Sequence, residues 1–258
     1  DILVIGSGPA GLAAALIAAK TGAKVFLVDQ NSEPGGDLLS SNLRVNKRPA
    51  MAWVDGVVSE LAKMTNVTHM QNSTAWAYRE HNLVIVNQRE VDNSSIIERS
   101  WRVRAKKVII ATGAIERSLV FANNDRPGVM LASAVHTFVN RYAIKVGDNL
   151  VLFTNNDSVY DYINALGKAG INILAIIDSR KIIPDQCLSR LKKIKVRANS
   201  IIKNVNGYKQ VKSIVVQSLD TGKFETISCD LLAHSGGWNP AVHLHSQSRG
   251  SLRFNEKI

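Results

Sequence analysis

The stretch DILVIGSGPAG, residues 1–11, decides the fold of this chain. An apolar strand runs directly into a Gly-x-Gly-x-x-Gly turn, and a helical pattern follows it. In such a turn Gly6 permits the tight bend, Gly8 lets the backbone approach phosphates, and Gly11 lets the helix lie close to the strand. The N-terminus of the helix then faces the anion. The stretch therefore predicts a site for the pyrophosphate of a dinucleotide.

The residues that follow supply the context that an isolated glycine motif lacks. An Ala-rich helical pattern covers residues 12–21, and a second apolar strand, residues 24–28, ends at Asp29. An acid about 20 residues after the turn bonds the ribose hydroxyls of a dinucleotide and disfavours a 2′-phosphate. Gly35 and Gly36 then allow another turn to approach the nucleotide. The pattern favours NAD or FAD over NADP.

Composition limits the class of protein. The 258 residues, 45% of them hydrophobic, can bury one large core or two modest ones. No apolar run is long enough to span a bilayer. Two distant cysteines, Cys187 and Cys229, exclude a dithiol redox centre within this chain and fit a reducing, cytoplasmic compartment. Because Asp1 starts a strand without an initiator Met, we expect a piece of a longer protein.

The net charge of +11 has two interpretations. Basic residues cluster at Lys47–Arg48, at 102–107 and at 192–197. They are either a solvated surface or an electrostatic attraction to an acidic partner or substrate. No aromatic interleaving or nucleic-acid motif accompanies them, so we predict no nucleic-acid binding.

A second unit repeats the strand–helix–strand–acid order of the first, at 149–153, 159–169, 171–177 and Asp178. Its turn, Thr154–Ser158, contains no glycine, so side chains block the approach of a phosphate. Asp157 would also repel a pyrophosphate and, with Ser158, serves better as a helix N-cap. We therefore expect one dinucleotide per chain, in an architecture that would allow two.

The predicted fold is α/β, with two Rossmann-like units of the two-dinucleotide-binding-domain flavoprotein type, the second inserted in the first. The first domain is expected to comprise 1–118 and 228–258, and the inserted unit 119–227. A buried strand at 107–110 ends in Ala-Thr-Gly, residues 111–113, whose small side chains let the backbone lie against a cofactor.

The remaining residues of interest are two histidines that could bind a metal and any side chain that could act as a nucleophile. His243 and His245 would place two imidazoles on one face of a strand, a possible start of a metal site. No cysteine or acid lies nearby in sequence, so we predict a structural or interface role and no metal. No nucleophile–base pair is evident, and no catalytic residue is assigned.

Four segments carry a resemblance to a known family: ATGAIER (111–117), VFANNDRPGVM (120–130), FTNNDS (153–158) and GGWNPAVHLHS (236–246). Through them the chain resembles the alpha subunit of heterotetrameric sarcosine oxidase over nearly all its length. Alpha subunits of that family are several times longer. The resemblance therefore implies a fragment that covers the dinucleotide-binding region and is inactive alone.

The resemblance also implies an activity and a set of partners. The complex, with beta, gamma and delta subunits, demethylates sarcosine oxidatively to glycine and hydrogen peroxide and passes the one-carbon unit to tetrahydrofolate. FAD lies in the beta subunit and FMN between alpha and beta, while the folate site lies in the part of alpha absent here. The glycine turn holds NAD that carries no hydride in turnover. The residues that the family would use for it are Gly6, Gly8, Pro9, Ala10, Gly11, Asp29, Gln30, Gly35, Gly36, Leu38, Ala75, Thr112 and Gly113.

Two other functions stay open on the sequence. One is a stand-alone pyridine nucleotide oxidoreductase that uses FAD and NAD(P)H, against which the glycine-free turn at Thr154–Ser158 argues. The other is a non-catalytic assembly scaffold with an empty site.

Overall fold

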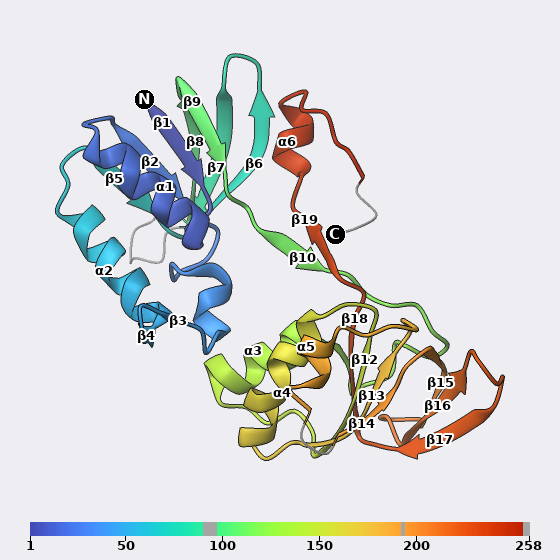
Figure 1. Cartoon of the computed structure of the whole chain (residues 1–258). Helices are drawn as coiled ribbons and strands as arrows, with labels where there is room; N and C mark the ends of the chain where they lie inside the picture. Colours follow the sequence, from blue (N-terminus) through green and yellow to red (C-terminus); the bar gives the residue numbers. More distant parts are fainter. Residues whose placement is uncertain (90–96, 192–193, 255–258) are drawn as a thin grey trace. The chain divides into compact units, whose positions relative to one another are not determined.

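The computed structural model describes residues 1–89, 97–191 and 194–254, and it divides the chain into two compact units (Figure 1). Unit 1 comprises Asp1–Ala114 and Pro240–Ile258, and unit 2 comprises Ile115–Asn239. Each unit has a parallel sheet with helices on one face and an antiparallel three-stranded sheet on the other. The predicted fold class, α/β with two Rossmann-like units, is confirmed.

The parallel sheet of unit 1 has the order β5-β2-β1-β9, with the bounds Val67–Met70, Val25–Val28, Ile2–Ile5 and Lys107–Ile110. Helices α1 (Pro9–Lys20) and α2 (Ala50–Ala62) pack on one face, where Leu12 and Val54 join Val4 in a buried cluster. The small side chains of α1 let this helix lie close to the strands. The opposite face is covered by a sheet formed by β6 (Ser73–Arg79), β7 (Leu83–Arg89) and β8 (Glu98–Arg104).

Short elements complete unit 1. They are the 3-10 helix η1 (Gly36–Ser40), strands β3 (Arg44–Val45) and β4 (Arg48–Pro49), and helix α6 (His243–Gln247). Helix α6 lies against β6, where the side chain of Gln247 accepts a hydrogen bond from the backbone N–H of Tyr78 (2.6 Å). Leu244 of α6 is buried in the cluster beneath the β6-β7-β8 sheet.

The parallel sheet of unit 2 has the order β11-β18-β12-β13-β14, with the bounds Val129–Leu131, Leu231–Ser235, Asn149–Thr154, Asn172–Asp178 and Lys195–Arg197. Helices α3 (Ala132–Tyr142), α4 (Ser158–Lys168) and α5 (Asp185–Leu188) contribute to the core on one face. The antiparallel sheet of β15 (Ser200–Asn206), β16 (Ser213–Ser218) and β17 (Phe224–Ser228) covers the other. Strands β10 (Ala114–Glu116) and β19 (Trp238–Pro240) pair where the chain passes between the units.

The course of the chain differs from the expectation in one strand. The sequence predicts that residues 228–258 belong to the first domain. In the structure, however, β18 pairs with β11 and β12 inside the sheet of unit 2. All five residues of β18 are buried. A strand buried on both faces belongs in the middle of a parallel sheet. The chain therefore leaves unit 1 after Ala114 and returns to it only at Pro240.

Candidate nucleotide site

The turn between β1 and α1 is closed by its own backbone. Gly6 has φ +102°, and a Cβ on it would lie well inside the 3.0 Å that Cβ atoms keep from other heavy atoms, against the carbonyl oxygen of Ala111. A Cβ on Gly11 would collide in the same way with the carbonyl oxygen of Gly6. Glycine is therefore required at both positions by packing of the chain on itself.

Gly8 differs from Gly6 and Gly11, because nothing within the described part of the chain requires a glycine there. Its φ of −68° and ψ of −179° suit any residue. A Cβ on Gly8 would meet only the Cα of Gly36, at 3.9 Å, an ordinary contact. Neither the backbone conformation nor packing among the described residues explains this glycine. Space for a group from outside the chain does explain it, and the residues present therefore fit a dinucleotide pyrophosphate.

Helix α1 presents a free N-terminus beside Gly8. No side chain among the described residues caps it, and its first turn holds no acid. Pro9 and Ala10, the first two helical residues, are exposed. The backbone N–H groups of the first turn and the positive end of the helix dipole therefore remain available to an anion.

A second glycine turn lies directly on the first. The N–H of Gly35 donates to the carbonyl of Ser7 (2.9 Å), and Gly35 has φ +127°. A Cβ on Gly36 would lie 3.0 Å from the Cα of Gly8, tighter than nearly all real contacts. The half-buried Leu38, in η1, packs against the helical core of unit 1. The two turns thus form one wall around the open space at Gly8.

Asp29, at the end of β2, is only 8% exposed and is tied to the first turn. One carboxylate oxygen accepts from the backbone N–H and from the hydroxyl of Ser7 (2.8 Å for the hydroxyl), and the other accepts from the N–H of Asn31 (2.8 Å). A carboxylate has about four acceptor positions, so one remains for a ribose hydroxyl. The adjacent Gln30 is exposed.

Two residues that lie near Asp29 were not predicted from the sequence. Ser7 lies between the glycines of the turn, and its bonds with Asp29 lock the turn to β2. His69 lies on β5 in register with Leu27, and burial lowers its pKa while the charge of Asp29 opposes that shift. A polar residue between two turn glycines was a usable signal for Ser7. His69 had none, because nothing in the sequence shows which strand neighbours β2.

The remaining predicted residues also lie in unit 1, at the carboxyl end of its sheet. Ala75 is in β6, whose first residue donates its N–H to the carbonyl of Asp29 (2.7 Å). Thr112 and Gly113 follow β9, and the Thr112 hydroxyl donates to the carbonyl of Ala241 (2.8 Å). Gly113 has φ +70° and open space where its Cβ would be. Direct contacts join the two glycine turns and Asp29. Ala75 instead pairs with Val86 of β7, and Thr112 and Gly113 bond to Ala241.

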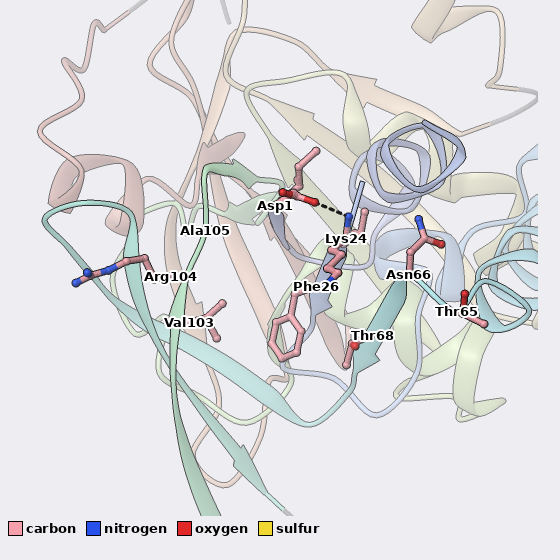
Figure 2. Close-up of a pocket in the computed structure, with 11 residues that line it drawn as sticks. Asp1, Lys24, Phe26, Thr65, Asn66, Thr68, Val103, Arg104 and Ala105 are labelled. Atoms are coloured by element: carbon pink, nitrogen blue, oxygen red, sulfur yellow. Dashed lines mark hydrogen bonds between the residues drawn. The ribbon is translucent and has the colours of Figure 1, made fainter. Parts of the chain in front are cut away.

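A cavity of unit 1 lies away from the glycine turns. It has a volume of about 310 Å³ at the amino ends of β1 and β2 (Figure 2) and is lined by Asp1, Lys24, Phe26, Asn66 and Arg104, among others. The Asp1 carboxylate accepts from the N–H of Lys24 there (2.9 Å). Ligands of open parallel sheets bind at the carboxyl ends of the strands. This cavity is therefore not the nucleotide site.

The corresponding turn in unit 2 is filled by its own side chains. The Asn156 amide oxygen accepts from the N–H of Ser158 (3.0 Å), and its amide nitrogen donates to Ser235 (3.1 Å to both the carbonyl and the hydroxyl). Asp157 holds the expected N-cap position of helix α4, but its side chain makes no capping bond and instead pairs with Arg180 (2.6 Å). The side-chain oxygen of Asn156, one residue earlier, accepts the N–H of the first helical residue, Ser158.

The acid of the second unit is also occupied. Asp178 has no exposed surface, and its carboxylate accepts from the guanidinium of Arg180 (2.8 Å) and the hydroxyl of Tyr160 (2.8 Å). The hydrogen bond to Asp178 raises the pKa of Arg180, and the hydrogen bond from Arg180 lowers the pKa of Asp157. Asp178, which corresponds to Asp29 of unit 1, is therefore engaged by an arginine of its own unit.

Replacing Arg180 with Met should destabilise unit 2 by about 3–5 kcal/mol, because it leaves the buried Asp178 without its counter-charge. Asp157→Asn is the control, since that carboxylate is 46% exposed and its loss should cost less than about 1 kcal/mol. The lowered pKa of Asp157 adds stability above its ordinary pKa that is lost as pH falls through the folded value. Denaturant unfolding at neutral and acid pH measures both; equal losses in the two variants would contradict the assignment.

The predicted strand arrangement of His243 and His245 is wrong. Both lie in helix α6, two residues apart, where side chains point about 200° away from each other. The ring of His245 lies 3.4 Å from the carbonyl of Ser251. In the described ranges no group of three or more His, Cys, Asp or Glu side chains could hold a metal ion. Cys187 and Cys229 are free and buried.

Two α/β units, with one glycine turn shaped for a dinucleotide, define the class of FAD- or NAD(P)-dependent oxidoreductases. Residues 1–150 match the family model of pyridine nucleotide-disulphide oxidoreductases. The chain belongs to that family.

Two relatives match this chain over nearly its whole length and indicate a more specific family. The chain is 38% identical to sarcosine oxidase subunit alpha of Corynebacterium sp. (strain U-96), over 100% of the chain and 28% of the relative. It is 39% identical to the subunit of the same name from Rhizobium meliloti (strain 1021), over 95% of the chain and 25% of the relative. The predicted resemblance is confirmed, and the chain spans about a quarter of the length of these relatives.

The fold has solved counterparts. The structure of T. acidophilum thioredoxin reductase superposes with a TM-score of 0.75 at 18% identity, over 99% of this chain and 82% of that one. Such a likeness concerns the fold alone. No helix in the described ranges combines the length and apolar character needed to cross a membrane.

Proposed function

We propose that this chain is the NAD-binding portion of the alpha subunit of a sarcosine oxidase complex. One observation carries the proposal: the glycine turn of unit 1 leaves unexplained space at Gly8, whereas the matching turn of unit 2 is filled by Asn156. A chain with one such site cannot place a nicotinamide against a flavin by itself. The bound NAD would therefore have a structural role.

The residues of unit 1 support NAD over NADP. Asp29 presents a buried carboxylate at the ribose position, where a 2′-phosphate would meet like charge. Gly8 and the free N-terminus of α1 would hold the pyrophosphate through backbone N–H groups. The family equally admits FAD, which is the alternative ligand for the same turn.

The remaining activity belongs, in this proposal, to other polypeptides. Oxidative demethylation of sarcosine, FAD and FMN would reside with beta, gamma and delta subunits, and the tetrahydrofolate site outside these residues. The names of the relatives, sarcosine oxidase subunit alpha, support the existence of such partners. This region alone would be inactive, and its two buried free cysteines are consistent with a cytoplasmic location.

The nucleotide can be identified directly. The full-length protein is purified, denatured, and its released ligand is examined by absorbance and mass. We expect an ultraviolet-absorbing compound with the mass of NAD and no visible flavin band from the alpha subunit. A yellow extract with the mass of FAD would favour a stand-alone FAD- and NAD(P)H-dependent oxidoreductase. No nucleotide in either the subunit or its complex would favour a scaffold.

A further inference from the structure

The β6-β7-β8 sheet of unit 1 has an outer face with an unusual composition. Val84 and Val86 of β7 are buried in the core, so their neighbours Leu83 and Ile85 point outward. Both are half-buried and belong to none of the hydrophobic clusters. The outer face of an antiparallel sheet is ordinarily polar. Here its central strand is apolar.

Arginines flank this apolar strand. On β8, Trp101 and Val103 pack inward, so Arg102 and Arg104 point outward. The register pairs Ile85 with Arg102, and it pairs Leu83 with Arg104 on one side and with Arg79 on the other. Figure 2 shows the side chain of Arg104 directed away from Phe26. Three guanidinium groups thus border two apolar side chains on one face.

An exposed tryptophan extends the same face. Trp76 occupies an irregularity of β6 between Ala75 and Ala77 and is 52% exposed. Its indole N–H donates to the side chain of Asn87 (3.3 Å), an outward residue of β7. Tryptophan and arginine are the residues most enriched among the dominant contacts of protein interfaces.

The arginines of this face lack counter-charges. Arg79, Arg102 and Arg104 are exposed and make no ion pair in the part of the chain that the structure describes. The acids closest in sequence are taken, because Glu80 pairs with Arg249 and Glu98 with Arg89. Uncompensated cations beside an apolar surface favour an anionic partner with apolar side chains of its own.

We propose that this face, defined by Trp76, Leu83, Ile85, Arg79, Arg102 and Arg104, docks an acidic, partly apolar surface of a partner subunit. The inference rests on the proposed function only for the existence of partners. A protein surface suits the face better than a nucleic acid does, because the centre is aliphatic and a single exposed aromatic offers little stacking. It also gives the basic cluster at 102–107 a function.

Charge reversal in the assembled complex tests the proposal. The full-length protein is co-expressed with its beta, gamma and delta partners, as wild type and as Arg102→Glu/Arg104→Glu. The matched control is Lys203→Glu/Lys223→Glu, two exposed lysines of the β15-β16-β17 sheet and its turn that form no ion pair with any described residue. We expect at least about a tenfold weaker association of the arginine variant in native mass measurements, with unchanged nucleotide content, and wild-type association of the control.

A second pair of variants removes apolar surface instead of charge. Trp76→Ala should weaken association, whereas Phe224→Ala, at a residue 62% exposed on β17, should not. Should the arginine variant fail to fold, Arg102→Gln/Arg104→Gln replaces it, and a smaller loss of association is expected.

Several outcomes would overturn the docking proposal alone. These are wild-type assembly of the arginine variant, protection of β6–β8 from hydrogen exchange already in the unpartnered full-length subunit, or a salt-dependent oligonucleotide affinity that the variant loses. Failure of wild-type subunits to assemble at all would instead refute the proposed function.

Discussion

Gly8→Val should abolish nucleotide binding while leaving the fold intact. The backbone at Gly8 accepts any residue, and an added Cβ meets only an ordinary contact with Gly36. The side chain would therefore occupy the space that the phosphates need. Loss of one or two charge-assisted hydrogen bonds, at about 1.5–3 kcal/mol each, predicts a Kd at least about tenfold higher. Nucleotide content per subunit after purification, together with calorimetric titration, measures the effect.

Gly8→Ala provides a graded version of the same test. Its single methyl group should weaken binding less than Val and should leave the thermal midpoint of the nucleotide-free protein unchanged within about 1 °C. Wild-type nucleotide content in Gly8→Val would refute the placement of the site. A folded variant that loses its nucleotide would support it, because the change lies at the proposed contact.

Gly11→Ala should have the opposite profile, a large loss of stability. The new Cβ would collide with the carbonyl oxygen of Gly6, a backbone atom that cannot move without displacing the strand–turn–helix junction. Overpacking against backbone should cost at least about 3 kcal/mol, which corresponds to a fall in Tm of about 10 °C. Thermal unfolding of the nucleotide-free protein measures it without interference from ligand stabilisation.

Gly56→Ala is the matched control for Gly11→Ala. Gly56 lies within α2, and a Cβ there would meet nothing within 4 Å. Replacing it should stabilise the protein by about 0.5–1 kcal/mol through helix propensity. If Gly11→Ala unfolded at the same temperature as Gly56→Ala, the close packing of α1 on the turn would be contradicted.

The fold and the candidate site were predicted best at positions where the backbone geometry requires one particular residue type. The order of strand, turn, helix, strand and acid placed Gly6, Gly11 and Asp29 together, because spacing along a βαβ unit determines which ends meet. The duplicated unit and its glycine-free turn followed from the same spacing. The role of each predicted residue in binding remains a prediction.

The sequence predicted least where distant segments meet. β18 was assigned to the wrong unit because an apolar run carries no information about which sheet contains it. Asp157 holds the predicted N-cap position, but its side chain does not cap the helix, since Arg180, 23 residues away, takes its carboxylate. The segment that contains His243 and His245 was predicted as a strand, because a five-residue helix is too short to show the helical repeat of apolar residues.

The Arg180 network also has a consequence for how sequences of this type diverge. Introducing glycines at Asn155 and Asn156 would leave Arg180 bound to Asp178. Removing Arg180 first would leave the buried carboxylate of Asp178 without a counter-charge. Each single step is therefore disfavoured in a background where the other has not occurred, so the two positions are coupled. Relatives of such a chain are expected to keep Asp178 and Arg180 together or to lose both, and a nucleotide site in the second unit would require coupled changes.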